Sequence, residues 1–194
     1  MSSLELTKRN ISIRAIILCG LFAALTALGA FIKIPIPPVP FTLQTLFVLL
    51  CAILLGSVRG AISQAVYVGL GLLGLPVFAG AGGGGIGYVL KPSFGYLLGF
   101  IIGAFVIGKI IETQKDNNLF SVFLASLIGI FIIYTVGVIY LYLILNLYLK
   151  TATPFYSVLY SGVIVFAPKD IVFCVVASIA GTQLIPVLKR QNLL

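Results

Sequence analysis

Long apolar runs, separated by short polar, proline-rich or glycine-rich connections, dominate this chain. A membrane-spanning helix needs about 20 predominantly apolar residues, and runs near this length recur from residue 13 almost to the C-terminus. We predict an all-α integral membrane protein that forms a single membrane domain over residues 1–194. Its six predicted transmembrane helices cover residues 13–32, 43–57, 60–75, 93–111, 119–149 and 168–188.

The last two apolar runs depart from a simple span. The run 119–149 is longer than one crossing requires, so we expect it to tilt or to project beyond the bilayer. The run 155–188 is interrupted by Pro168, Lys169 and Asp170. We predict a loop or half-helix over 155–167 and a spanning helix that starts at Pro168, because proline is favoured at the first helical position.

Composition supports a membrane protein and excludes a soluble enzyme. Hydrophobic residues make up 61% of the chain and charged residues 8%, whereas soluble domains carry roughly 25% charged residues. The six spans leave no room for a soluble catalytic domain. The three cysteines all lie inside apolar runs, where they are expected to be small buried residues: Cys19, Cys51 and Cys174.

The distribution of charge predicts the orientation. The net charge of +8 comes from basic residues at the ends of apolar runs, which is typical of topology signals and not of nucleic-acid binding. If both termini are cytoplasmic, eight basic residues fall inside and three in the outer loops, which fits the positive-inside rule. The inner set is Lys8, Arg9, Arg14, Arg59, Lys109, Lys115, Lys189 and Arg190, and the outer set is Lys33, Lys91 and Lys150.

One acidic residue stands apart from the others. On this map Glu5, Glu112 and Asp116 are cytoplasmic, and Asp170 alone lies in the membrane or on its outer side. A carboxylate in that position is costly unless it is paired, so it indicates a functional site. The alternative is a structural ion pair with Lys169 at the headgroup level.

The two longest outer connections predict a binding pocket that opens to the outside. Residues 33–41 contain four prolines and form a stiff, extended segment. Residues 76–92 contain six glycines, yet the loop also carries Val77, Phe78 and Tyr88. We expect this apolar loop to fold down over a cavity, with a flexible linker as the alternative.

Several kinds of chemistry are absent. The chain has no histidine, which excludes Ser-His catalysis and histidine metal sites, and it has no P-loop sequence for ATP. We therefore predict no enzymatic activity, no cofactor and no bound metal. Two functions remain: a substrate-capturing subunit that partners energise, and a solitary carrier or channel.

Four motifs carry a resemblance to a known family. In order, they are Pro-x-Pro-Pro-Val-Pro-Phe-Thr-Leu-Gln-Thr at 35–45, Leu-Gly-Ser-Val-Arg-Gly at 55–60, Gly-Leu-Pro-Val-Phe-Ala-Gly at 74–80 and Gly-Tyr-Leu-Leu-Gly-Phe at 95–100. Together they resemble the BioY family, the biotin-binding S components of energy-coupling-factor (ECF) transporters. The resemblance runs from about residue 23 to residue 181.

This resemblance implies a fold, a ligand and partners. Such proteins are six-helix bundles in the cytoplasmic membrane of prokaryotic cells, and their outer loops cap a biotin pocket. They associate with a transmembrane T component and two ABC ATPases, which would supply the ATP site that this chain lacks. Some family members are thought to work alone, so the solitary reading stays open.

The sequence departs from the family at two places. The family usually reads Gly-Pro-Thr-Gly-Gly-Tyr where this chain has Lys-Pro-Ser-Phe-Gly-Tyr at 91–96. It usually has lysine where this chain has Phe173, whereas Asp170 is kept and a lysine is present at Lys169. Positions 169 and 173 share one helix face, so the charge is expected to have moved one turn along that face.

The expected site follows from the chemistry of biotin. Asp170 would accept hydrogen bonds from the ureido N–H groups, and Lys91 or Lys169 would meet the carboxylate. Predicted contributors from the outer segments are Phe41, Gln44, Phe78, Gly80, Gly84 and Tyr88. On the first helix, the small residues Ala23 and Ala27 are four apart and form the predicted partner interface, with internal packing as the alternative.

Overall fold

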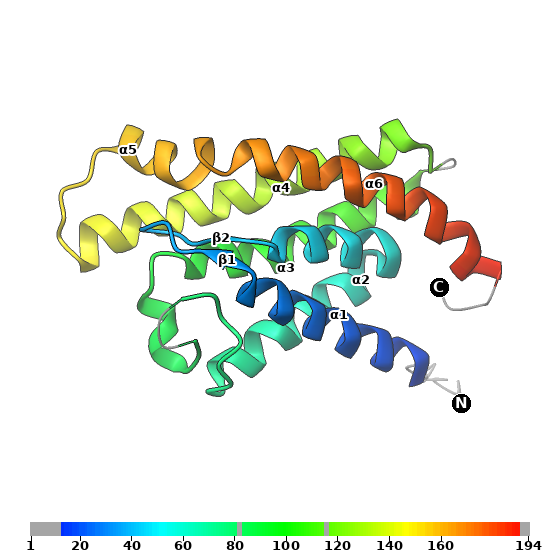
Figure 1. The fold of residues 1–194 in the computed structure, drawn as a ribbon, viewed down its shortest axis with the longest axis horizontal. Coiled ribbons are helices and arrows are strands. Elements are labelled where there is room, and N and C mark those ends of the chain that lie inside the picture. Colours follow the sequence, from blue (N-terminus) through cyan, green and yellow to red (C-terminus); the bar gives the residue numbers. More distant parts are fainter. Residues whose placement is uncertain (1–12, 81–82, 115–116, 191–194) are drawn as a thin grey trace, which may run out of the picture.

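The computed structural model describes residues 13–80, 83–114 and 117–190. Long helices lie side by side along the molecule, and the start of the first helix and the end of the last lie at the same end (Figure 1). We call this the inner end and the opposite one the outer end. Five charged residues used in the orientation argument lie outside the described residues: Glu5, Lys8, Arg9, Lys115 and Asp116.

Within the described residues, five helical segments are long and apolar enough to cross a membrane. Three are single helices: α1 (Ile13–Phe31), α2 (Gln44–Leu72) and α3 (Phe94–Thr113). The fourth joins α4 (Leu119–Leu143) to the π-helical turn η2 (Ile144–Tyr148). The fifth joins α5 (Phe155–Leu159), the π-helical turn η3 (Tyr160–Ile164) and α6 (Ala167–Arg190).

The helix α2 contains two of the predicted spans, and they meet at Gly56. This residue has φ +79° and ψ −172°, which breaks the helix into arms 44–55 and 57–72. The arms fold back on each other, because a Cβ built on Gly60 would lie 3.3 Å from the Cα of Ala52. The predicted spans end at 57 and resume at 60, whereas the structure places the break at Gly56 alone and Arg59 belongs to the second arm.

The carboxylate of Glu112, at the end of α3, holds this reversal in place. The Ser57 backbone N–H donates to Oε1 at 2.7 Å, and the Ser57 hydroxyl donates to Oε2 at 2.8 Å. A negative charge at the start of the second arm also suits the helix dipole. Gly56 must lack a side chain, because a Cβ there would lie 2.4 Å from the same Oε1.

The first outer segment is a short antiparallel ribbon rather than an open extended loop. Strand β1 (Lys33–Ile34) pairs with β2 (Phe41–Thr42), with Lys33 opposite Thr42. The purely helical prediction needs this correction, because the prolines occupy the bend and leave both ends free to pair. The glycine-rich segment likewise contains a 3-10 helix, η1 (Ile86–Leu90).

The last apolar run is less interrupted than its sequence predicts. The backbone N–H of Asp170 donates to the carbonyl of Phe166 at 3.1 Å, so helical bonding passes through the Pro-Lys-Asp sequence. The predicted half-helix over 155–167 is present as α5 and η3, and α6 begins at Ala167 instead of Pro168. Asp170 lies in the first turn of α6, but its own N–H is already bonded.

Candidate functional site

A cavity with mainly apolar walls and several polar groups lies between the outer segments and the helices in the outer half of the molecule. About 50 Å³ of it is open to the centres of water molecules, which is room for a few waters. The lining combines hydroxyl, amide and charged groups with apolar and aromatic walls. The lining residues are Val39, Pro40, Thr42, Gln44, Thr45, Ala79, Tyr88, Ser93, Tyr96, Leu97, Phe100, Ile133, Tyr134, Phe166, Lys169 and Asp170.

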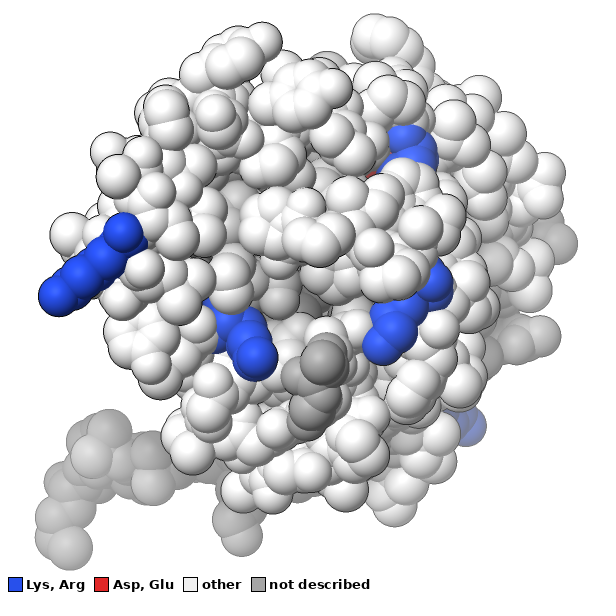
Figure 2. Space-filling model, turned by 60° about the vertical axis from the view of Figure 1, so that its left-hand side comes forward, with Lys and Arg blue, Asp and Glu red and all other residues white. Residues whose placement is uncertain are grey.

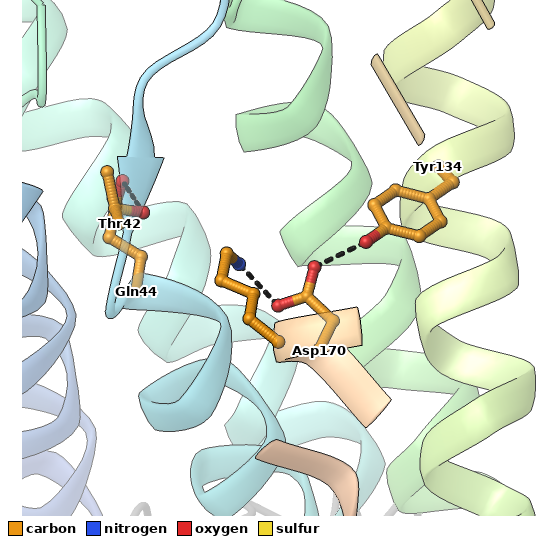
Figure 3. Close-up of polar contacts among 5 residues, drawn as sticks. Thr42, Gln44, Tyr134 and Asp170 are labelled. Atoms are coloured by element: carbon orange, nitrogen blue, oxygen red, sulfur yellow. Dashed lines mark hydrogen bonds and ion pairs between the residues drawn. The ribbon is translucent and has the colours of Figure 1, made fainter. Parts of the chain in front are cut away.

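Asp170 is the charged centre of this cavity. Its side chain is buried, with 2% of the residue exposed. One carboxylate oxygen accepts from the Tyr134 hydroxyl of α4 at 2.5 Å, and the other lies 2.5 Å from the ammonium of Lys169 (Figure 3). The ion pair that the sequence offered as an alternative is therefore formed, and both of its residues line the cavity.

Aromatic rings surround the ammonium of Lys169. Its Nζ lies 5.0 Å from the ring centre of Phe41, 5.1 Å from that of Phe173 and 5.8 Å from that of Phe166. Aromatic faces attract a cation at such distances, and more strongly when water is excluded. Lys169 and Phe173 contact each other as the helix spacing predicts, so the cation occupies the same face as the lysine expected by family resemblance.

Gln44 faces the cavity from the start of α2 and is fixed by two partners. Its Oε1 accepts from the Thr42 hydroxyl at 3.2 Å (Figure 3), and its Nε2 donates to the Tyr67 hydroxyl at 2.6 Å. The Tyr67 hydroxyl in turn donates to the carbonyl of Val77 at 3.1 Å. This chain of bonds connects β2, both arms of α2 and the glycine-rich loop.

The glycine-rich loop covers one side of the cavity. Phe78 is buried between Tyr67, at 5.6 Å between ring centres, and Tyr88, at 4.4 Å. The neighbouring Ala79 lines the cavity, and its carbonyl accepts from the ammonium of Lys33 at 2.7 Å. Lys33 of the first outer segment therefore holds the glycine-rich loop through this hydrogen bond.

The residues predicted for the site fall into three groups. Gln44, Tyr88, Lys169 and Asp170 line the cavity. Phe41, Phe78 and Gly80 lie behind the lining. A Cβ atom built on Gly80 would lie 3.1 Å from the Tyr88 hydroxyl. Gly84 and Lys91 do not reach it: Gly84 packs on Leu75, which follows α2, and Lys91 is exposed on the surface.

Sequence reasoning missed several lining residues, of which three carry hydroxyl groups that matter for the site. Tyr134 lies in an apolar run, and apart from its hydroxyl group nothing in the neighbouring sequence marks it as a site residue. Tyr96 belongs to a recognised motif and donates to the carbonyl of Gly162 at 2.8 Å. Thr42 is adjacent to a predicted residue and could have been found from its place in the Thr-Leu-Gln sequence.

The two small residues predicted as a partner interface on α1 do not both lie on the surface. Ala23 is buried inside the chain, with 3% exposed, and Ala27 is partly buried. The exposed small residues four apart are instead Gly20 and Ala24, and a Cβ at Gly20 would meet nothing within 4 Å. Ala23 therefore serves internal packing, as the sequence alternative allowed.

The outer end presents basic side chains. Figure 2 shows blue side chains spread over this face and almost no red. Lys33, Lys91 and Lys150 are exposed, whereas Asp170 is buried. A surface of this kind attracts anions toward the cavity.

Comparisons with known proteins agree with the resemblance found in the sequence. The sequence model of the BioY family matches residues 4–190. A probable biotin transporter BioY from Lysinibacillus sphaericus is 44% identical over 92% of this chain and 90% of its own length, and a biotin transporter BioY from Rhizobium etli is 36% identical over 88% and 92%. A solved structure of the S-component for biotin from an ECF-type ABC transporter matches with TM-score 0.76 and 28% identity, covering 89% of this chain and 90% of the other.

Proposed function

The chain belongs to the BioY family, and on this basis we propose that it captures biotin in the outer-end cavity as the S component of an ECF-type transporter. Family membership confirms a transport component rather than an enzyme. The observation that carries the proposal is the buried unit of Asp170, Lys169 and Tyr134 at the cavity wall.

This unit is complementary to the ureido ring of biotin. A cyclic urea presents a carbonyl acceptor beside N–H donors on one edge. Asp170 accepts from the N–H groups, and Lys169 has further N–H donors for the carbonyl. The Tyr134 hydroxyl directs its single hydrogen to Asp170, so its oxygen can accept from a ureido N–H. Charged partners strengthen such bonds, and the rings around Lys169 supply an apolar wall for the thiophane.

The carboxylate of biotin must then bind elsewhere. It stands at the end of an alkyl chain, remote from the ureido ring, so Lys169 cannot meet both while it remains beside Asp170. Lys33 and Lys91 are the basic side chains of the two outer segments that flank the cavity. We assign the carboxylate to this lysine-bearing rim.

Capture requires the outer segments to move. The space for a few waters does not accommodate a bicyclic ring with its side chain. The bond from Lys33 to Ala79 and the bond from Tyr67 to Val77 hold the glycine-rich loop against the cavity. Their opening would admit the ligand, and their closing would retain it.

For the membrane topology, we propose that each arm of α2 crosses the bilayer, giving six crossings with both termini cytoplasmic. The shared end of α1 and α6 supports the even number of crossings. Because Cys19, Cys51 and Cys174 are buried, single introduced cysteines can report accessibility. Gly87→Cys should react with an impermeant thiol reagent from outside and Thr113→Cys should not; the opposite pattern would contradict the orientation.

For the partners, we propose that the exposed face of α1 meets a T component, which assembles with two ABC ATPases. Small residues let helices approach closely in lipid, and Gly20 and Ala24 are the exposed pair. Ala24→Trp should abolish transport and leave biotin binding intact. Unchanged transport without any ATPase in the cell would favour a solitary carrier.

The direct test is equilibrium binding of radiolabelled biotin to the purified protein in detergent. The proposal predicts saturable retention that unlabelled biotin displaces. Affinity weakened in Asp170→Asn but kept in Lys150→Gln would support the site. A protein that retains no biotin would contradict capture and favour a channel.

A further inference from the structure

A second cavity, larger than the first, lies at the inner end. About 590 Å³ of it is open to the centres of water molecules. It is bounded by both arms of α2 near Gly56, the end of α3, Gln114 and Asn117, and α6 near its end. We call it the inner groove. Its lining residues are Ile53, Leu54, Leu55, Gly56, Ser57, Val58, Arg59, Lys109, Ile111, Glu112, Gln114, Asn117 and Ile185.

The inner groove has a cationic rim. Arg59 and Lys109 line it, and within the described residues neither side chain forms a hydrogen bond or an ion pair. The one acid of the lining, Glu112, directs both carboxylate oxygens to Ser57. Two cations against one committed carboxylate leave one net positive charge, and the start of the second α2 arm adds the positive end of its dipole.

Two acceptors in the same groove lack donors. The Oε1 of Gln114 and the Oδ1 of Asn117 are buried, and neither has a hydrogen-bond partner in the described part of the chain. Buried polar atoms without partners are uncommon and call for an explanation. A ligand that brings hydroxyl donors beside an anionic group would satisfy both the amide oxygens and the cations.

Apolar residues form the rest of the groove. Ile53, Leu54, Leu55, Ile111 and Ile185 are buried or nearly buried there, and Val58 extends the apolar lining to the surface with 51% exposed. The groove therefore joins an apolar floor to a cationic rim at the end of membrane-spanning helices. That combination matches an acyl chain beneath an anionic headgroup.

We propose that the inner groove binds an anionic phospholipid, with its phosphate between Arg59 and Lys109 and its headgroup hydroxyls toward Gln114 and Asn117. Phosphatidylglycerol has this chemistry, with one negative charge and two free hydroxyls. The proposed orientation places this lipid in the cytoplasmic leaflet. The site is separate from the biotin cavity and does not depend on biotin capture.

The test uses purified protein in mixed micelles that contain dioleoylphosphatidylglycerol or dioleoylphosphatidylcholine. Phosphatidylglycerol should raise the thermal unfolding midpoint by several degrees more than phosphatidylcholine, since a ligand stabilises the state that it binds. Arg59→Gln and Lys109→Gln should each weaken the apparent affinity for phosphatidylglycerol at least tenfold. Lys150→Gln removes the same charge at the outer end and should leave that affinity unchanged.

Two further measurements distinguish a specific lipid site from a loss of fold and from binding of a free phosphate. Arg59→Lys keeps the charge and should retain most of the affinity, while biotin retention in every variant reports that the fold and the outer cavity are intact. Free glycerol phosphate should not replace the lipid, because it lacks the acyl chain. Equal stabilisation by both lipids, equal loss in Lys150→Gln, or full replacement by glycerol phosphate would each overturn the lipid site.

Discussion

The two ends of the molecule handle buried charge in different ways. At the outer end, the carboxylate of Asp170 is paired on both oxygens, and the ammonium of Lys169 is surrounded by rings, around a cavity of about 50 Å³. At the inner end, the cations Arg59 and Lys109 are unpaired within the described residues, and the groove is about 590 Å³. The proposed biotin site is therefore closed and would have to open for its ligand, whereas the proposed lipid site has cations and acceptors without partners among the described residues.

The contrast follows from how each end is built. The outer cavity is closed by segments that are tied to one another, through Lys33 and Ala79 and through Tyr67 and Val77. The inner groove is framed by a tight reversal at Gly56, which the carboxylate of Glu112 fixes. On the proposed account, capture and release require the outer contacts to open, while the reversal at the inner end stays fixed.

Gly56→Ala should produce the largest effect, at the inner end. The backbone conformation there is almost confined to glycine, and a side chain would also displace the carboxylate that caps Ser57. We expect a loss of stability of about 3 kcal/mol, seen as a lower unfolding midpoint. Gly69→Ala, in the same helix and with open space around its Cβ position, is the matched control, and equal loss in both variants would contradict the role of the reversal.

Asp170→Asn should produce the largest effect at the outer end. The amide keeps the shape but removes the charge that pairs with Lys169 and one acceptor for the ureido group. Since a hydrogen bond to a charged group contributes about 1.5–3 kcal/mol, the affinity for biotin should fall roughly tenfold to a hundredfold. Phosphatidylglycerol stabilisation should not change, and parental biotin affinity in the variant would remove Asp170 from the site.

Lys169→Met distinguishes the two positions that the ligand carboxylate could take. If Lys169 serves the ureido carbonyl, the variant should lose about tenfold in affinity for biotin and for biotin amide alike. A much larger loss for biotin than for the amide would show instead that Lys169 meets the carboxylate. The comparison uses competition against radiolabelled biotin, with Lys91→Met measured in parallel.

Lys33→Met should produce the smallest effect. It removes the bond to the Ala79 carbonyl and one positive charge near the entrance. A single hydrogen bond from a charged donor contributes about 1.5–3 kcal/mol when fully buried, but Lys33 is exposed, so we expect a few-fold faster release of biotin. The release rate is measured by chasing bound radiolabelled biotin with unlabelled biotin and filtering. An unchanged rate would contradict the role of the Lys33–Ala79 bond in retaining the ligand.

The helices could be predicted from the sequence because hydropathy depends on long runs of residues. Their boundaries at Ile13, Phe94 and Leu119 agree with the predicted spans to within a residue. The reversal inside α2 could not be predicted in detail, since its polar cap, Glu112, comes from 55 residues further along the chain. The ribbon of β1 and β2 escaped notice because each strand has only two residues.

Site residues could be predicted from the sequence when their residue type is rare in the membrane-embedded part of the chain, and not when it is common. Asp170 stood out as the one acid away from the cytoplasmic side, and the structure places it in the cavity. Tyr134 is one of nine tyrosines, and only the packing of α4 on α6 reveals its role. On α1, a shift of one residue rotates a position by about 100°, which is enough to turn Ala23 inward and Ala24 outward.

The most direct test of the central claim compares three ligands on the parental protein: biotin, biotin amide, and biotin methylated on a ureido nitrogen. If Asp170, Lys169 and Tyr134 together hold the ureido ring, methylation removes a donor and adds bulk in a buried cavity. The account predicts at least a tenfold loss of affinity on methylation and a smaller loss for the amide, whose carboxylate partner lies at the exposed rim. Undiminished binding of the methylated ligand, together with a large loss for the amide, would contradict it.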